Sequence, residues 1–179
     1  MRIFISGGCK NGKSYYAQRL AKQQKTRPLY YIATMAPTDS EDRDRIERHR
    51  YERAGWGFET VEQHCRIEDI LYKCDTNGSF LLDSLTALLA CEMFPQSGVV
   101  DIEAAERIAV GLKKVLEEIE NIVIVSDYIY SDAVLFDPLT EKYRESLAKL
   151  DKTAAANCDR VIEVAYSCVI EHKKVPDGL

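Results

Sequence analysis

The feature that most constrains this chain is a glycine-rich segment near its N-terminus. Residues 7–14 read Gly-Gly-Cys-Lys-Asn-Gly-Lys-Ser, a full match to the phosphate-binding pattern G-x-x-x-x-G-K-S/T. A short apolar run at 2–6 precedes the segment and a helical pattern from Ser14 to about Lys25 follows it, the context that this pattern requires. The alternative, a glycine turn that happens to contain Lys-Ser, does not explain why strand, loop and helix are all in register. The sequence therefore predicts a P-loop.

Each residue type in this loop suits phosphate binding. Glycines let backbone N–H groups curl around phosphate oxygens, and the N-terminus of the following helix adds the positive end of its dipole. We expect Lys13 to reach the β- and γ-phosphates and Ser14 to offer its hydroxyl to Mg²⁺. The nucleotide-binding residues predicted in the loop are Gly7, Gly8, Cys9, Lys10, Asn11, Gly12, Lys13 and Ser14.

Short β-rich runs alternate with longer amphipathic ones along the whole chain. Parallel strands are expected at residues 2–6, 29–34, 80–83, 122–127 and 160–166, with an antiparallel strand at 168–172. Apolar stripes at helical spacing predict core-packed helices at 105–119 and 139–154, the second with Asp137 as N-cap and Pro138 at its first position. With no linker or repeat in between, we expect one α/β domain over residues 1–179, a mostly parallel central sheet with helices on both faces.

Charge and composition exclude some functional classes. Lys and Arg number 24 against 29 Asp and Glu, a formal net charge of −5, which argues against a general nucleic-acid or membrane-surface binder. No apolar stretch approaches the roughly 20 residues of a membrane span, and no signal-peptide core follows Met1. The six cysteines contain no C-x-x-C pair. We therefore expect a cytoplasmic protein with reduced cysteines and no nucleic-acid partner.

A P-loop enzyme needs a second acid to help hold its metal ion, and two candidates end hydrophobic strands. Phe80-Leu81-Leu82-Asp83 has the required form, and Ile124-Val125-Ser126-Asp127 has it too. An aspartate after a strand is also a common turn or cap residue, so the pattern alone does not choose between them. We expect one of the two to face the nucleotide, and Asp83 is our candidate Mg²⁺ ligand beside Ser14.

The segment from Asp39 to Arg53 is unusually charged, with six acids, five arginines and His49. On a helix, Arg45, His49 and Arg53 would share one face. Neighbouring cations favour the neutral imidazole, the form that can attack phosphorus, and arginines can grip phosphates. The spacing is equally compatible with an exposed histidine on a solvated surface helix.

Several blocks in the first half of the chain match the motifs of a known family. They are residues 1–14, Tyr31-Ile32-Ala33-Thr34, Arg45-Ile46-x-x-His49-x-x-x-Arg53, Trp56-x-x-Glu59-Thr60-Val61-Glu62 and Leu81-Leu82-Asp83-Ser84-Leu85-Thr86. Together they resemble the bifunctional adenosylcobinamide kinase / adenosylcobinamide-phosphate guanylyltransferase family of cobalamin biosynthesis. Many enzymes share the P-loop, whereas the Arg-Ile-x-x-His block followed by Trp and Val-Glu is far more specific.

The resemblance implies a RecA-like P-loop fold, a trimer and two reactions. The first is phosphorylation of the aminopropanol hydroxyl of adenosylcobinamide. The second is transfer of GMP from GTP to the resulting phosphate through a covalent guanylyl-histidine. The family would thus use ATP and GTP as substrates, Mg²⁺ as cofactor and a corrinoid as small-molecule partner.

The same resemblance assigns roles residue by residue. His49 matches the guanylylated histidine and, with Lys13, is predicted to be catalytic. Arg50 and Arg53 would lie beside the phosphates of the guanylylated form. The remaining predicted nucleotide-site positions are Ala33, Thr34, Met35, Glu62 and Asp83.

The second half of the chain departs from the family pattern. Where the family usually shows Asn-Glu-Val-Gly-x-Gly-Ile-Val-Pro, residues 126–134 read Ser-Asp-Tyr-Ile-Tyr-Ser-Asp-Ala-Val. Two alternatives to the bifunctional enzyme therefore remain: a divergent P-loop kinase for another small hydroxyl compound, and a non-catalytic GTP- or ATP-binding regulator.

Overall fold

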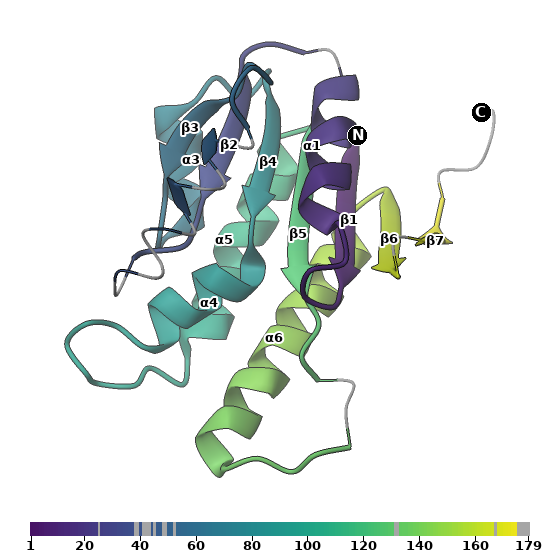
Figure 1. The fold of residues 1–179 in the computed structure, drawn as a ribbon. Helices are drawn as coiled ribbons and strands as arrows, with labels where there is room; N and C mark the ends of the chain where they lie inside the picture. Colours follow the sequence, from purple (N-terminus) through teal and green to yellow (C-terminus); the bar gives the residue numbers. More distant parts are fainter. Residues whose placement is uncertain are drawn as a thin grey trace.

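The computed structural model describes residues 1–24, 26–37, 40, 44, 46–47, 50–51, 53–130, 133–166 and 168–174. Within these residues, seven strands form one sheet (Figure 1). The strands are β1 (Arg2–Gly7), β2 (Leu29–Ala33), β3 (Glu59–Glu62), β4 (Ser79–Asp83), β5 (Ile122–Asp127), β6 (Arg160–Ala165) and β7 (Cys168–Lys173).

The strand order is β3-β2-β4-β5-β1-β6-β7, and every pair is parallel except β6 with β7. The six strands expected from the sequence are confirmed, each within one residue at either end, as is the antiparallel pairing of the last one. Since β1 lies between β5 and β6, the P-loop leaves the sheet beside the ends of two strands from the second half of the chain.

Helices cover both faces of this sheet, as predicted. They are α1 (Lys13–Gln23), α3 (Ile70–Lys73), α4 (Leu85–Met93), α5 (Ala104–Glu118) and α6 (Pro138–Asn157), with a 3-10 turn at Ile67–Asp69. The helix α1 packs on β1, β4 and β5. Figure 1 shows α1 in front of β1, with α5 and α6 behind the sheet. Among the described residues, no helix combines the length and the apolar character needed to cross a membrane.

The alternation within β1 shows how the two layers arise. Ile3 and Ile5 pack with α1, whereas Phe4 packs into the larger core formed with α4, α5 and α6. All three side chains are at most 3% exposed. A strand buried on both faces reads as a continuous hydrophobic run, which is why periodicity marks it less clearly than length and flanking residues do.

Some elements differ from the pattern-based expectations. The edge strand β3 was not expected, because Glu59-Thr60-Val61-Glu62 is polar and mostly exposed. Nor was α4, whose apolar residues lie all round the helix rather than in one stripe. On α6 the cap is as predicted, since Asp137 accepts hydrogen bonds from the Leu139 and Thr140 amides. The stripe predicted as core is wrong at Leu139, which is 39% exposed in the first turn.

Candidate nucleotide-binding site

The P-loop joins the carboxyl end of β1 to the first turn of α1. Gly12 is the N-cap of α1 at φ 92°, and Lys10 also has a positive φ of 56°. Only glycine adopts such a backbone at little cost, which explains Gly12. The cap residue Gly12 has no side chain to accept a hydrogen bond, and the first turn carries no acidic residue. The Lys13 amide donates a long hydrogen bond of 3.3 Å to Asn11 Oδ1. This helix end therefore suits an anion such as a nucleotide phosphate.

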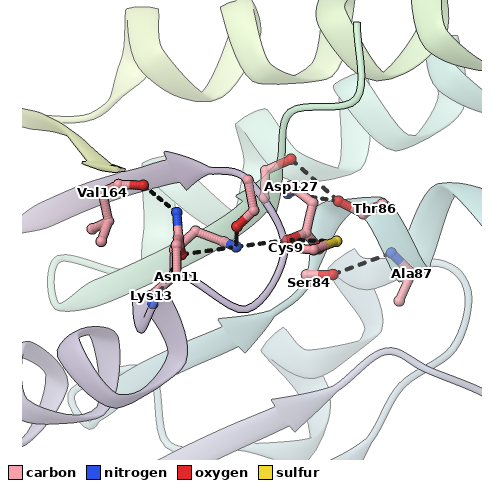
Figure 2. Close-up of polar contacts among 10 residues, drawn as sticks. Cys9, Asn11, Lys13, Ser84, Thr86, Ala87, Asp127 and Val164 are labelled. Atoms are coloured by element: carbon pink, nitrogen blue, oxygen red, sulfur yellow. Dashed lines mark hydrogen bonds and ion pairs between the residues drawn. The ribbon is translucent and has the colours of Figure 1, made fainter. Parts of the chain in front are cut away.

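Gly7 is required by a close approach between the loop and β6. A Cβ on Gly7 would collide with the Val164 carbonyl oxygen and would lie 2.5 Å from Asn11 Nδ2 and 3.1 Å from Lys13 Cδ. The side-chain amide of Asn11 donates a hydrogen bond to the same carbonyl oxygen, so the loop is attached to β6 as well as to β1 (Figure 2).

We expect Gly7→Ala to lower the free energy of unfolding by about 1–3 kcal/mol, because backbone atoms of β6 must move to make room. Gly8→Ala is the matched control, since a Cβ there meets no described atom within 4 Å. It should change stability by less than about 0.5 kcal/mol. Urea denaturation without nucleotide measures both variants, and equal stabilities would contradict the steric argument.

The Lys13 side chain folds back onto the end of the sheet. Its Nζ donates to the Gly8 carbonyl oxygen at 2.7 Å and forms an ion pair with Asp127 Oδ1 at 2.6 Å, and Lys13 is only 5% exposed. The Asp127 amide in turn donates to Thr86 Oγ1 at 2.8 Å (Figure 2). Lys13 is thus charged, preorganised and held at the loop, where phosphate oxygens can replace Asp127 as its partner.

The two acids weighed from the sequence both lie at the carboxyl edge, on the neighbouring strands β4 and β5. Asp83 ends β4 opposite Val125, and its Oδ2 accepts a hydrogen bond from the Tyr31 hydroxyl at 2.7 Å. Asp127 ends β5, next to β1, and contacts Lys13 directly. Of the two acids, Asp127 therefore has the closer contact with the P-loop, although Asp83 was our candidate metal ligand.

A metal ion would find suitable oxygen donors here. The described residues contain no cluster of three or more His, Cys, Asp or Glu that could hold a metal by itself. Mg²⁺ commonly takes one or two carboxylates plus substrate phosphates and waters rather than a complete protein cage. The Ser14 hydroxyl with Asp83 or Asp127 fits that mode of binding.

The three predicted positions after β2 differ in their surroundings. Ala33 and Met35 are half-buried, whereas Thr34 is fully buried. The Thr34 hydroxyl donates to the Ser84 carbonyl oxygen and accepts from the Ser84 amide, both at 2.7 Å. In this structure Thr34 joins the ends of β2 and β4 and thereby positions Asp83.

Arg50, Arg53 and Glu62 come together in a groove of about 570 Å³ beside the edge of the sheet. We call it the arginine groove; its lining residues are Arg50, Arg53, Ala54, Gly55, Gly57, Phe58, Thr60 and Glu62. Arg50 pairs with Glu62 at 2.6 Å. The Arg53 guanidinium is 3.5 Å from the centre of the Tyr31 ring, and the Tyr31 hydroxyl donates a hydrogen bond to Asp83. The groove is thus linked to the carboxyl edge through one aromatic residue.

His49 and Arg45 lie outside the described residues, as do positions 131 and 132 of the altered loop. Of the described members of the charged segment, 40, 44, 46, 47, 50 and 51 are helical, whereas Arg53 lies in the turn that follows. This agrees with the helix predicted there, while the shared face of Arg45, His49 and Arg53 stays a prediction.

Sequence reasoning did not find three further residues of the site. Tyr31 was quoted only within a motif, although its hydroxyl and ring connect Asp83 to Arg53. Thr86 accepts from the Asp127 amide, and nothing in its local pattern signals that contact. Asp151 lies on the buried face of α6, where a polar residue inside an apolar stripe was the available signal.

Burial gives Asp151 an unusual protonation equilibrium. The carboxyl group is 4% exposed, and desolvation raises its pKa from 3.8 to about 6. The negative charge of Asp127 adds to the rise, while hydrogen bonding from the Tyr130 hydroxyl at 2.7 Å and the nearby Ser126 hydroxyl opposes it.

This pKa predicts a stability that falls as the pH rises. Between the unfolded pKa of 3.8 and the folded pKa of about 6, the folded chain binds more protons than the unfolded one. The difference corresponds to about 3 kcal/mol lost from about pH 4 to about pH 7. Asp151→Asn should remove this component. Denaturation curves of both proteins across the range measure it, and parallel pH profiles would contradict the assignment.

Comparisons with known proteins agree with the geometry of the P-loop and with the order of the sheet. A family model described as cobinamide kinase / cobinamide phosphate guanyltransferase matches residues 3–171. The bifunctional adenosylcobalamin biosynthesis protein CobP of Pseudomonas aeruginosa is 30% identical over 168 residues, 90% of this chain and 91% of that protein. The protein CobU of Escherichia coli, with the same description, is 30% identical over 102 residues, 56% of this chain and 55% of the relative.

Solved structures of low sequence identity share the fold. The flagellar accessory protein FlaH from Methanocaldococcus jannaschii has a TM-score of 0.52 at 14% identity, covering 96% of this chain and 77% of that structure. A KaiC-like protein from Pyrococcus horikoshii has a TM-score of 0.52 at 12% identity, covering 98% of this chain and 79% of that structure. The chain has a RecA-like P-loop fold and belongs to the cobinamide kinase / cobinamide phosphate guanyltransferase family.

Proposed function

We propose that this protein is a bifunctional enzyme that phosphorylates adenosylcobinamide and then transfers GMP from GTP to the product through a guanylyl-histidine at His49. The observation that carries the proposal is the intact phosphate site: a helix N-terminus with glycine at its cap and no acid in its first turn, a preorganised Lys13 and two carboxylates at one edge of the sheet. A purely structural protein would have no use for an intact Lys13–Ser14 pair.

In the kinase step, the acceptor hydroxyl oxygen attacks the γ-phosphorus of the nucleotide, and the nucleoside diphosphate leaves. Lys13 and the N-terminus of α1 stabilise the charge on the transferred group and on the leaving diphosphate. Ser14 with Asp83, our candidate, or with Asp127 would hold Mg²⁺, which would supply further charge neutralisation.

In the guanylyl step, a ring nitrogen of His49 attacks the α-phosphorus of GTP and pyrophosphate leaves. A phosphate oxygen of the phosphorylated acceptor then attacks the guanylyl phosphorus, and His49 is released. A phosphoramidate transfers its phosphorus group readily, so histidine suits this carrier role.

The arginine groove supports the second step. Arg50 and Arg53 are the cations for the phosphates of the guanylylated form, and Glu62 with Asp83 is assigned to the guanine nucleotide. Arg53 is held in place by the Tyr31 ring, which reduces the entropy lost when it binds a phosphate. Ala33, Thr34 and Met35 complete the nucleotide site. A trimeric assembly and a cytoplasmic location belong to the same proposal.

A second candidate is a P-loop kinase for another small hydroxyl compound. The altered residues 126–134 favour it, since this segment includes Asp127, the partner of Lys13, followed by Tyr128 and Tyr130. Kinase assays with adenosylcobinamide and with other small alcohols distinguish the two candidates.

The test is the intact mass of the protein after incubation with GTP and Mg²⁺, together with a kinase assay on adenosylcobinamide. A mass increase of one guanylyl group and corrinoid-dependent ADP or GDP release are expected. Absence of the adduct with GTP still bound would overturn the transferase part, and absence of corrinoid-dependent turnover would overturn the kinase part.

A further inference from the structure

A second cavity, of about 440 Å³, lies between α6 and the β1–β6–β7 side of the sheet. We call it the α6 cavity; its polar lining residues are Ser6, Tyr128, Tyr130, Asp151, Lys152, Glu163 and His172. Apolar and aliphatic groups from Phe4, Ala148, Ala155 and Val161 form most of the rest of the wall. Its volume falls in the range that small-molecule sites have.

Asp151 is the unexplained group in this cavity. Its Oδ2 accepts the hydrogen bond from Tyr130, but its Oδ1 is buried without a hydrogen-bond partner. A buried carboxylate oxygen without a donor costs about 1–3 kcal/mol or more, so folding alone does not explain its presence. The residue lines the cavity, where a donor group on a bound molecule would satisfy Oδ1.

Other side chains of the wall contact one another and shape the remaining space. Glu163 Oε2 pairs with His172 Nε2 at 2.8 Å. The Tyr128 and Tyr130 rings lie 6.5 Å apart at an interplanar angle of 51°. Lys152 lines the same wall and offsets one of the two carboxylates, so net charge does not decide what the cavity binds. The buried Oδ1 of Asp151 and the apolar wall suit a group with an apolar stem and one hydrogen-bond donor.

The α6 cavity adjoins the phosphate loop. Ser6 directly precedes Gly7, and it pairs in register with Ser126 on one side and Glu163 on the other. The Tyr128 amide donates to the Gly7 carbonyl oxygen at 3.3 Å. Asp127, the partner of Lys13, immediately precedes Tyr128. A molecule seated in the cavity would thus have the β1 end of the P-loop as its neighbour.

We propose that the α6 cavity receives the hydroxyl-bearing arm of the acceptor in the kinase step, with Asp151 Oδ1 accepting the hydrogen bond of that arm. The inference rests on the proposed kinase function and names the residues that recognise its second substrate. It also gives a role to the altered loop: Tyr128 and Tyr130 form the wall that contacts the acceptor, and Tyr130 orients Asp151.

The pH dependence of acceptor binding follows from the same contact. Protonation of Asp151 below about pH 6 turns the acceptor oxygen into a donor and weakens the bond to the hydroxyl. The titratable and charged groups that face Asp151 or its cavity are Asp127, Tyr128, Tyr130, Tyr143, Lys152, Glu163 and His172. Because several of these groups carry charge, comparing variants isolates the contribution of Asp151.

The test is steady-state kinase kinetics of Asp151→Asn with adenosylcobinamide as the varied substrate. The KM for the acceptor should rise by about 10- to 100-fold, the effect of losing a charge-assisted hydrogen bond. The KM for the nucleotide and the yield of guanylyl adduct should stay unchanged. In the wild type we expect acceptor kcat/KM to fall below about pH 6, and in the variant this fall should diminish.

Two further variants make the test specific. Glu145→Gln is the matched control, an acid-to-amide change at an exposed position on the same helix, and should behave as wild type. Ala148→Leu narrows the cavity while keeping the Asp151 carboxylate and should also raise the acceptor KM alone.

The outcomes separate this inference from the proposed function. The inference alone would be overturned if both Asp151→Asn and Ala148→Leu kept the acceptor KM and the pH profile of the wild type while kinase turnover and the guanylyl adduct were intact. A wild-type protein that shows no corrinoid-dependent turnover would overturn the kinase function and this inference with it.

Discussion

Replacing His49 with alanine should abolish the guanylyl adduct completely while leaving a folded protein. The imidazole is the proposed nucleophile, and alanine has no group that can attack the α-phosphorus of GTP. The segment around His49 is rich in charge and poor in apolar residues, so the core does not depend on it. Intact mass after incubation with GTP and Mg²⁺ measures the adduct, and circular dichroism checks the fold.

The chain contains only three histidines, which makes the assignment easy to control. His64→Gln should keep the adduct of the wild type. The bond should be labile in acid and stable in alkali, as a phosphoramidate is, and peptide mapping should place it on residue 49. An adduct that persists in His49→Ala would refute the assignment, and loss of folding in that variant would indicate a structural role instead.

Lys13→Met should lower kinase kcat/KM by about 100- to 1,000-fold, since removing one preorganised positive group from a transition-state site typically has an effect of that size. Methionine retains most of the aliphatic stem, so packing at this 5%-exposed position changes little. What is lost is the ammonium group that now contacts Gly8 and Asp127 and would contact the phosphates.

Lys22→Met is the matched control for that variant. It removes the same charge from the other end of α1, where Lys22 lies 5.3 Å from the centre of the Trp56 ring. Its kinase activity should stay within about threefold of wild type, since an exposed charge outside the site is worth less than about 1 kcal/mol. Wild-type turnover in Lys13→Met would contradict the assigned role of Lys13 and favour a non-catalytic nucleotide-binding regulator.

Much of the fold follows from local sequence patterns. The strand–loop–helix unit around residues 7–14 can be recognised from a short stretch of sequence, because its glycines, Lys13 and the helix N-terminus are close together in the chain. The buried strands were recognised from continuous apolar runs bounded by turn residues, and the α6 cap from Asp137 followed by Pro138. Where the local pattern was uninformative, the prediction failed: β3 is a polar edge strand, and α4 is apolar on all sides.

The candidate site too was predicted in part from the sequence and in part left to the fold. Sequence alone identified the P-loop, and it identified Arg50, Arg53 and Glu62, which the structure brings into one groove. It could not choose between Asp83 and Asp127, because both end apolar strands. The choice of Asp127 as the partner of Lys13 depends on strand order, since β5 is the neighbour of β1 and β4 is one strand farther away.

The sequence by itself determined the class of fold, the phosphate loop and the family, since each depends on residues close together in the chain. Only the tertiary structure decided which distant residues share a cavity. Ser6, Asp151 and Glu163 meet because parallel pairing places β6 beside β1 while α6 crosses behind them. Such contacts depend on strand order and helix packing rather than on any local period. A buried aspartate therefore looks like an interruption of an apolar stripe until the fold shows the cavity that it faces.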